Sequence, residues 1–170
     1  MTPFEPTPAE LRHLERAVEL AAEALRAGDE PFGSVLAGAD GRILTEDRNR
    51  VRTLDDNTRH PGFELVRWAT AHLTPRQRAQ TTVYTSGEHC PMCAAAHGWA
   101  GLGRIVYVHS ATQLSQWLTA LGVPPSPVRC VPVQDVVPGL DVRGPVPGLT
   151  SRMHDMHVAF HSGRPDSTAP

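Results

Sequence analysis

Two short motifs that lie far apart in the chain constrain its fold more than any other feature. Cys90 and Cys93 form a Cys-x-x-Cys motif at the start of a predicted helix, and His60 lies well upstream, at the start of another predicted helix. A Cys-x-x-Cys motif at a helix start lets two thiolates converge on one cation, and the amides of the first turn help to keep them deprotonated. If the three side chains share a cation, the fold must bring two helix starts together.

These three side chains fit a zinc centre better than a redox centre. Three protein ligands that leave one position for water are typical of catalytic zinc, whereas a structural zinc site uses four protein ligands. A Cys-x-x-Cys motif between a strand and a helix also serves thioredoxin-like redox chemistry. Such chemistry does not require His60, so the sequence favours zinc, and the redox alternative stays open at this point.

Hydrophobic periodicity predicts helices and strands that alternate around these motifs. Thr7, Pro8 and Glu10 form the start signal of a first helix that ends at Gly28, and residues 39–41 (Ala-Asp-Gly) form a hairpin signal. The predicted strands are 31–39, 42–49, 81–85, 104–109 and 131–137; the predicted later helices are 60–72, 90–100, 113–121 and 149–160, with a loop over 51–59. This order favours an α/β/α layered domain with a mixed sheet.

The composition is that of an ordinary globular domain with no electrostatic preference for nucleic acid. The 170 residues suffice for one domain, to which we assign 1–161, followed by a flexible polar tail over 162–170. The formal net charge of -2 makes a nucleic-acid partner unfavourable. The chain starts without a signal-peptide pattern and contains no apolar run long enough to span a membrane. We therefore expect a cytoplasmic protein with no membrane partner.

Four blocks of sequence are more specific than the ligand pattern alone. They are 31–35 (Pro-Phe-Gly-Ser-Val), 49–51 (Asn-Arg-Val), 56–60 (Asp-Asn-Thr-Arg-His) and 85–93 (Thr-Ser-Gly-Glu-His-Cys-Pro-Met-Cys), which continues through 99–104 (Trp-Ala-Gly-Leu-Gly-Arg). In their order and spacing these blocks resemble the cytidine/deoxycytidylate deaminase superfamily, specifically its branch of guanine, cytosine and tRNA-adenosine deaminases.

The resemblance implies a cytidine deaminase-like fold, with a five-stranded mixed sheet between helices and one zinc ion held at two helix N-termini. It also implies zinc-dependent hydrolytic removal of an exocyclic amine from a small nucleobase, nucleoside or related heterocycle, by a homodimer. The residues that match the family pattern are His60, Cys90 and Cys93 as zinc ligands, Asn49 as a hydrogen-bonding partner of the substrate, Phe32 and Gly33 as pocket wall, and Ser86 and Glu88 in the backbone beside the attacked atom.

The chain departs from the pattern at the residue that moves protons. Zinc deaminases carry His-x-Glu, in which the Glu is a general acid and base and not a ligand, whereas this chain has His60, Pro61 and Gly62. General acid–base catalysis contributes roughly 10²–10⁴-fold to a rate. Loss of the Glu is the simplest explanation, and it predicts an impaired site that a Gly62→Glu exchange restores.

Two other carboxylates are weaker candidates for the missing group. Glu64 lies one helical turn after His60, nearly on the same helical face, although a solvated or interface Glu is the more ordinary interpretation. Glu88 would have to bend toward the metal, and the family gives its position another role. The alternative function is a catalytically inactive or repurposed deaminase-fold protein that binds zinc and a base.

Several other residues have ordinary interpretations. His89 replaces the usual Pro before Cys90, and we expect it to line the pocket or contact a ligand residue without binding the metal. Cys130 lies in an apolar, strand-like segment and is predicted to be a buried thiol. His154, His157 and His161 recur at helical spacing, and we predict that they form a solvated face of the last helix.

Overall fold

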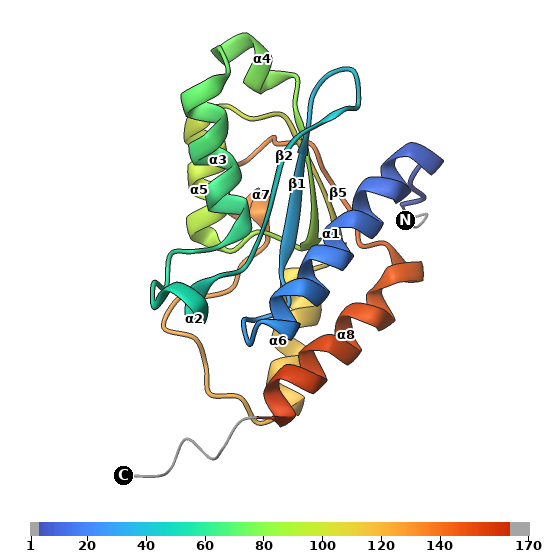
Figure 1. The fold of residues 1–170 in the computed structure, drawn as a ribbon, viewed down its shortest axis with the longest axis vertical. Coiled ribbons are helices and arrows are strands. Elements are labelled where there is room, and N and C mark those ends of the chain that lie inside the picture. The colour runs from blue at the N-terminus through green and yellow to red at the C-terminus, as the bar shows by residue number, and fades with distance from the viewer. Residues whose placement is uncertain (1–3, 164–170) are drawn as a thin grey trace.

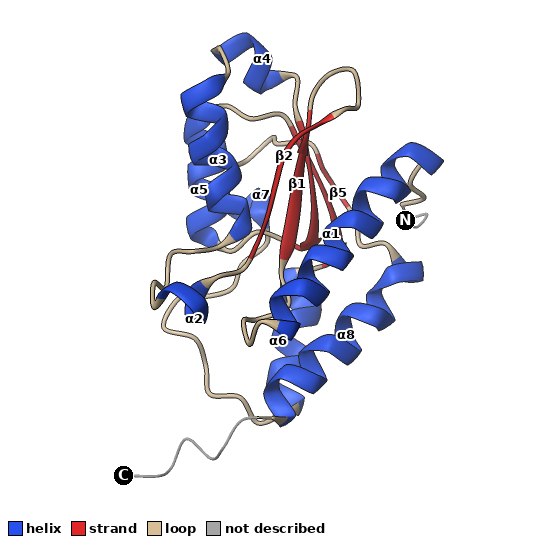
Figure 2. Cartoon of the chain, in the orientation of Figure 1, coloured by secondary structure: helices blue, strands red, loops and turns tan. Residues whose placement is uncertain are grey.

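Helices cover both faces of a five-stranded sheet (Figures 1 and 2). In the computed structural model, which describes residues 4–163, the strand order is β2-β1-β3-β4-β5. Strand β1 pairs antiparallel with both β2 and β3, and β4 lies parallel to both β3 and β5. The predicted α/β class and the five-stranded mixed sheet are confirmed.

The strands are β1 (Gly33–Ala37), β2 (Ile43–Arg48), β3 (Thr82–Gly87), β4 (Arg104–His109) and β5 (Val142–Arg143). The helices are α1 (Pro8–Arg26), α2 (Val51–Leu54), α3 (Pro61–His72), α4 (Pro75–Ala79), α5 (Pro91–Ala100), α6 (Ala111–Ala120), α7 (Val133–Val136) and α8 (Pro147–Ser162). Helices α3, α5 and α7 lie on one face of the sheet, and α1, α6 and α8 lie on the other (Figure 1).

Alternating side chains of the central strands build one hydrophobic core on each face of the sheet. Val35 and Val106 point into the core beneath α1 and α8, whereas their neighbours Leu36 and Ile105 point into the core beneath α3 and α5. This alternation follows from the two-residue period of a strand. A sheet buried on both faces is the arrangement that the alternating order of elements predicts.

The elements with local start and stop signals form where they are predicted. Helix α1 begins with a capping box in which Thr7 and Glu10 bond each other's backbone. Gly41, at φ 77°, turns the chain between β1 and β2, and Gly101, at φ 67°, ends α5. The sequence therefore correctly predicts α1, the β1–β2 hairpin and α5, the helix that carries the Cys-x-x-Cys motif.

Two predictions of secondary structure are wrong. The segment 51–59 begins with the helical turn α2, because the buried carboxylate of Asp29 accepts hydrogen bonds from the backbone amides of Arg52 and Thr53. The segment 131–137 is not a strand: Pro132 precedes the one-turn helix α7, and the last strand, β5, forms later, with Val142 opposite Ile105. Both errors come from partners that lie far away in the sequence.

The described part of the chain ends just after α8. Helix α8 extends to Ser162, and the remainder of the predicted tail beyond residue 163 lies outside the described residues. Within residues 4–163, no helix has both the length and the apolar character needed to cross a membrane. The cytoplasmic location stays a prediction.

Candidate metal centre

The three candidate ligands lie at the N-termini of two neighbouring helices. His60 is the N-cap of α3 and Cys90 is the N-cap of α5, and a proline follows each of them as the first helical residue. Neither side chain makes the hydrogen bond of a capping residue, so both remain available for other partners. Because α3 and α5 pack against each other, the two helix starts meet, as the motifs require.

The donor atoms converge closely. The Sγ atom of Cys90 lies 3.5 Å from Nδ1 of His60 and 3.7 Å from Sγ of Cys93. All three donor atoms lie within 4.8 Å of one another. Among the described residues, this is the one set of at least three His, Cys, Asp or Glu side chains that converges to this degree.

The electrostatics of the cluster suit a cation. The hydrogen bond from the Cys93 thiol, together with the His60 imidazole, lowers the pKa of Cys90 to about 4. The bond to Cys90 in turn raises the pKa of His60, and the same neighbour and burial raise the pKa of Cys93. Of the three groups, Cys90 therefore loses its proton most readily relative to its ordinary pKa. A metal ion would bind all three groups in their deprotonated forms.

Two thiolates and one imidazole form a donor set that zinc accepts, and three ligands leave a fourth position for water or substrate. The set therefore fits the predicted zinc centre. Zinc would add the field of a divalent cation to the partial positive charges of two helix N-termini, so the thiolates are needed to balance the charge of the site.

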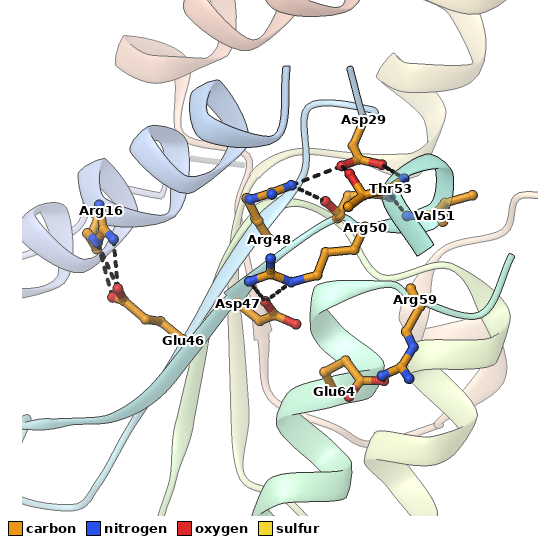
Figure 3. A network of polar contacts seen from close by, with 11 residues as sticks. Arg16, Asp29, Glu46, Asp47, Arg48, Arg50, Val51, Thr53, Arg59 and Glu64 are labelled. Carbon is orange, nitrogen blue, oxygen red and sulfur yellow. Dashed lines mark hydrogen bonds and ion pairs between the residues drawn. The ribbon is translucent and has the colours of Figure 1, made fainter. Parts of the chain in front are cut away.

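No carboxylate occupies the position from which the proton carrier was expected. Gly62 is the second residue of α3. Glu64 lies on the same helix, where its Oε1 atom is 3.3 Å from Nη1 of Arg59 (Figure 3). Glu64 thus already forms an ion pair with Arg59. That it replaces the proton carrier missing at Gly62 stays a prediction.

The carboxylate of Glu88 is engaged elsewhere. Its Oε2 atom accepts a hydrogen bond of 2.8 Å from the backbone amide of Ala111, and its Oε1 atom accepts one of 2.8 Å from that of Val133. These are the first residues of α6 and α7, whose amides have no partner within the helix. Glu88 thus joins two helix starts to the end of β3. Because both of its oxygens already accept hydrogen bonds from backbone amides, Glu88 is poorly placed to act as the proton carrier.

Asn49 lies directly after β2, on a loop that Asp29 fixes. Asn49 is buried, and its Oδ1 atom accepts a hydrogen bond from the amide of Val51, which leaves its NH₂ group without a hydrogen bond to the described residues. On either side, Arg48 and Thr53 bind the carboxylate of Asp29 (Figure 3). Although burial opposes the charge of Asp29, the hydrogen bonds from Thr53, Arg48 and Arg52 outweigh it and lower its pKa.

The other predicted pocket residues have structural contacts of their own. The ring of Phe32 packs against His109 and His157, at centroid distances of 6.1 and 5.1 Å. A Cβ atom at Gly33 would collide with the backbone of α1, so close packing already requires glycine there. The amide of Gly33 donates to Oγ of the buried Ser86. Their contact with substrate stays a prediction.

His89 is buried beside this cluster. Burial is the main cause that lowers its pKa to about 3, and the neighbouring His97 and His60 contribute. Its ring does not belong to the set of converging donor atoms. Its position agrees with the expectation that His89 does not bind the metal, and its place in the pocket wall or against a ligand residue stays a prediction.

The prediction of a solvated histidine face on the last helix is wrong for two of its three members. His157 is 1% exposed, the side chain of His161 is 2% exposed, and only His154 is partly open to solvent. The ring of His157 lies edge-on to that of His109, at 5.3 Å. The helical spacing correctly predicts a shared face, but that face points toward β4 and α6.

Cys130 is also placed differently. It is exposed, and its Sγ atom lies 3.8 Å from the carbonyl oxygen of Ala111. The prediction of a buried thiol in a strand is wrong because the segment before α7 runs over the surface. Asp29 and His109 were not expected to shape the site, since each acts through partners that no local motif reveals.

Comparisons with known proteins agree with this geometry. A family model described as the cytidine and deoxycytidylate deaminase zinc-binding region matches residues 8–109. Guanine deaminase from Bacillus subtilis is 38% identical over 104 residues, which cover 61% of this chain and 66% of that protein. The tRNA-specific adenosine deaminase from Agrobacterium fabrum is 35% identical over 100 residues, which cover 58% of this chain and 65% of that protein.

The fold is also found among solved structures. Guanine deaminase from Nitrosomonas europaea superposes with a TM-score of 0.66 at 17% identity, covering 93% of this chain and 86% of that protein. This likeness concerns the fold alone. The matched region spans less than two thirds of the two curated relatives above.

The ligand set predicts one zinc ion per chain, lost when a ligand is removed. We expect the purified protein to contain stoichiometric zinc, and a Cys93→Ser variant to lose most of it, because a hydroxyl is a much poorer zinc ligand than a thiolate. Cys130→Ser is the matched control, since this exposed thiol lies outside the cluster. Zinc content is measured by mass spectrometry of the dialysed proteins. Full zinc retention in Cys93→Ser would contradict the assignment.

The buried histidines predict a loss of stability in mild acid. Burial lowers the pKa of His109 to about 4; burial and the neighbouring His109, His161 and His154 lower that of His157 to about 2. The unfolded chain, with an ordinary histidine pKa of about 6.5, takes up protons first. This contribution to stability is therefore complete above about pH 6.5 and is lost as the pH falls toward the folded-state values.

A His157→Phe variant should lose less stability than the native chain between pH 6.5 and 4.5. The difference in the free energy of unfolding should grow by about 1.4 kcal/mol per pH unit, as measured by urea titration at several pH values. Because both proteins keep His60, Cys90 and Cys93, loss of zinc affects them equally. Parallel pH profiles would show that His157 is not held neutral by burial.

Proposed function

Because the chain belongs to the cytidine and deoxycytidylate deaminase family, we propose that it hydrolytically removes an exocyclic amine from a free base or nucleoside of the guanine or cytosine type. The observation that carries the proposal is the convergence of His60, Cys90 and Cys93 at two helix starts. Zinc bound there would act as a Lewis acid that activates water. The formal net charge of -2 makes a nucleic-acid substrate unfavourable.

The residues around the cluster would orient the heterocycle. The NH₂ group of Asn49 is available to a ring oxygen or nitrogen, and the loop that carries it is fixed by Asp29. Phe32 offers an apolar face with two histidine rings behind it. Such a wall, with a few placed polar groups, is typical of a small-molecule site.

The absence of a carboxylate at Gly62 sets the expected rate. A proton must leave the attacking water, and another must reach the departing amine, so a site without its acid–base group should be slower by roughly 10²–10⁴-fold. The second candidate function is a binding protein that holds a base without converting it. The same Gly62 position favours it.

Ammonia release from guanine, cytosine, their nucleosides and related aminoheterocycles separates the two functions. We expect slow, zinc-dependent turnover of at least one of them, roughly 10²–10⁴-fold below that of Bacillus subtilis guanine deaminase acting on guanine in the same assay. The zinc-depleted Cys93→Ser variant serves as the control. Turnover as fast as that of the reference enzyme would show that Gly62 does not limit the site. Tight binding of a base without ammonia release would support the binding protein.

We also propose that the chain forms a homodimer. Trp99, on the helix that carries the Cys-x-x-Cys motif, is 92% exposed, and tryptophan is enriched at protein interfaces. A Trp99→Glu exchange should lower the sedimentation coefficient from that of a dimer toward that of a monomer. Leu54→Glu, at an exposed apolar residue on α2, is the control. A native protein that sediments as a monomer would contradict the proposal.

A further inference from the structure

The space beside Gly62 is occupied by the ring of His89. A Cβ atom at Gly62 would lie 2.6 Å from Nε2 of His89 and 3.0 Å from both Cδ2 and Cε1. No side chain fits position 62 while the imidazole stays there. Gly62 is helical and has no positive φ, so its backbone does not require glycine. The requirement comes from His89.

A glycine in this place has a cost that needs an explanation. In a helix, glycine is less favourable than alanine. Gly148 provides a comparison, because it also follows a proline at the second position of a helix, α8, and has nothing within 4 Å of its Cβ position. The close contact with a side chain is what distinguishes Gly62 from Gly148.

His89 is buried, yet its two ring nitrogens make no hydrogen bonds to the described residues. The residue is 4% exposed, and its ring lies edge-on to that of His97 at a centroid distance of 5.8 Å. Among the described residues, neither of its ring nitrogens has a hydrogen-bond partner. A buried polar atom without a partner destabilises the fold, and such atoms commonly bind water, an ion or a ligand.

His89 lies next to the metal centre both in the sequence and in the fold. It immediately precedes the ligand Cys90, and its ring lies against Gly62, two residues after the ligand His60. In zinc deaminases, the side chain two residues after the histidine ligand is the glutamate that handles protons. The imidazole therefore fills the room from which that side chain would start.

We propose that Gly62 and His89 form a coupled unit, in which the His89 imidazole takes the room of a side chain at position 62 and offers its unpaired nitrogens to the molecule bound at the metal centre. A neutral imidazole provides one donor and one acceptor, whereas a carboxylate provides acceptors only. The coupling follows from packing alone. The contact with a bound molecule rests on the proposed function.

The coupling changes how the missing carboxylate must be restored. A single Gly62→Glu exchange drives the new side chain into His89, so it should damage packing instead of restoring the site. The family pattern has Pro before the first cysteine. The double variant Gly62→Glu/His89→Pro returns both positions to that pattern, and we expect it to release ammonia at least tenfold faster than either single variant.

A double-mutant cycle on the zinc-loaded protein tests the coupling without any assay of activity. Gly62→Ala should lower the urea midpoint in the native background, and it should leave the midpoint unchanged or raise it when His89 is replaced by Ala. Gly148→Ala, the matched control, should have the same small effect in both backgrounds. Equal losses from Gly62→Ala in both backgrounds would overturn the coupling.

Cobalt substitution tests the contact with the bound molecule, here water. The visible absorption of Co²⁺ at the site reports its coordination sphere and requires no substrate. His89→Phe should bind one Co²⁺ with shifted bands, and His89→Gln, which keeps a donor and an acceptor, should move the bands back toward the native spectrum. Identical spectra in all three proteins would overturn this part of the proposal. A demonstrated coupling with no ammonia release from any variant would instead refute the proposed function alone.

Discussion

The meeting of two helix starts is the constraint on which the rest of this structure depends. Helices α3 and α5 lie side by side on one face of the sheet, and each begins with a metal-ligand residue followed by proline. Their N-termini concentrate positive partial charge at one point. Thiolates at Cys90 and Cys93 offset that charge and, with His60, hold the cation that the donor geometry fits. The sheet is the rigid support on which the two helices pack, and it keeps their N-termini close together.

Two carboxylates, the buried Asp29 and the partly buried Glu88, hold the loops around the centre. Asp29 binds the first amides of α2 and thereby fixes the loop of Asn49, while Glu88 binds the first amides of α6 and α7. Both carboxylates are thus engaged in structural hydrogen bonds. Among the described residues, both ring nitrogens of the His89 imidazole lack a hydrogen-bond partner, and the ring packs where a side chain at position 62 would start. The centre therefore combines a complete set of metal donors with an altered proton-handling position.

Local signals made much of this architecture predictable, and long-range partners account for what was missed. The capping box at Thr7, the turn at Gly41 and the stop at Gly101 act within a few residues. The sequence therefore predicts the helices and strands that begin or end at these signals. The turn of α2 depends on Asp29, which is remote in sequence, and the direction of the His157 face depends on packing against β4. Gly62 and His89 were both recognised as departures, but only the fold shows that they touch.

A crystal structure of the zinc-loaded native protein tests the central claim most directly. We expect zinc bound to His60, Cys90 and Cys93 with one position left to a non-protein ligand, and the His89 ring in contact with the Cα atom of Gly62. A metal centre closed by a fourth protein ligand would contradict the account of the centre. A His89 ring turned away from Gly62, with an empty space beside that glycine, would contradict the account of the altered position.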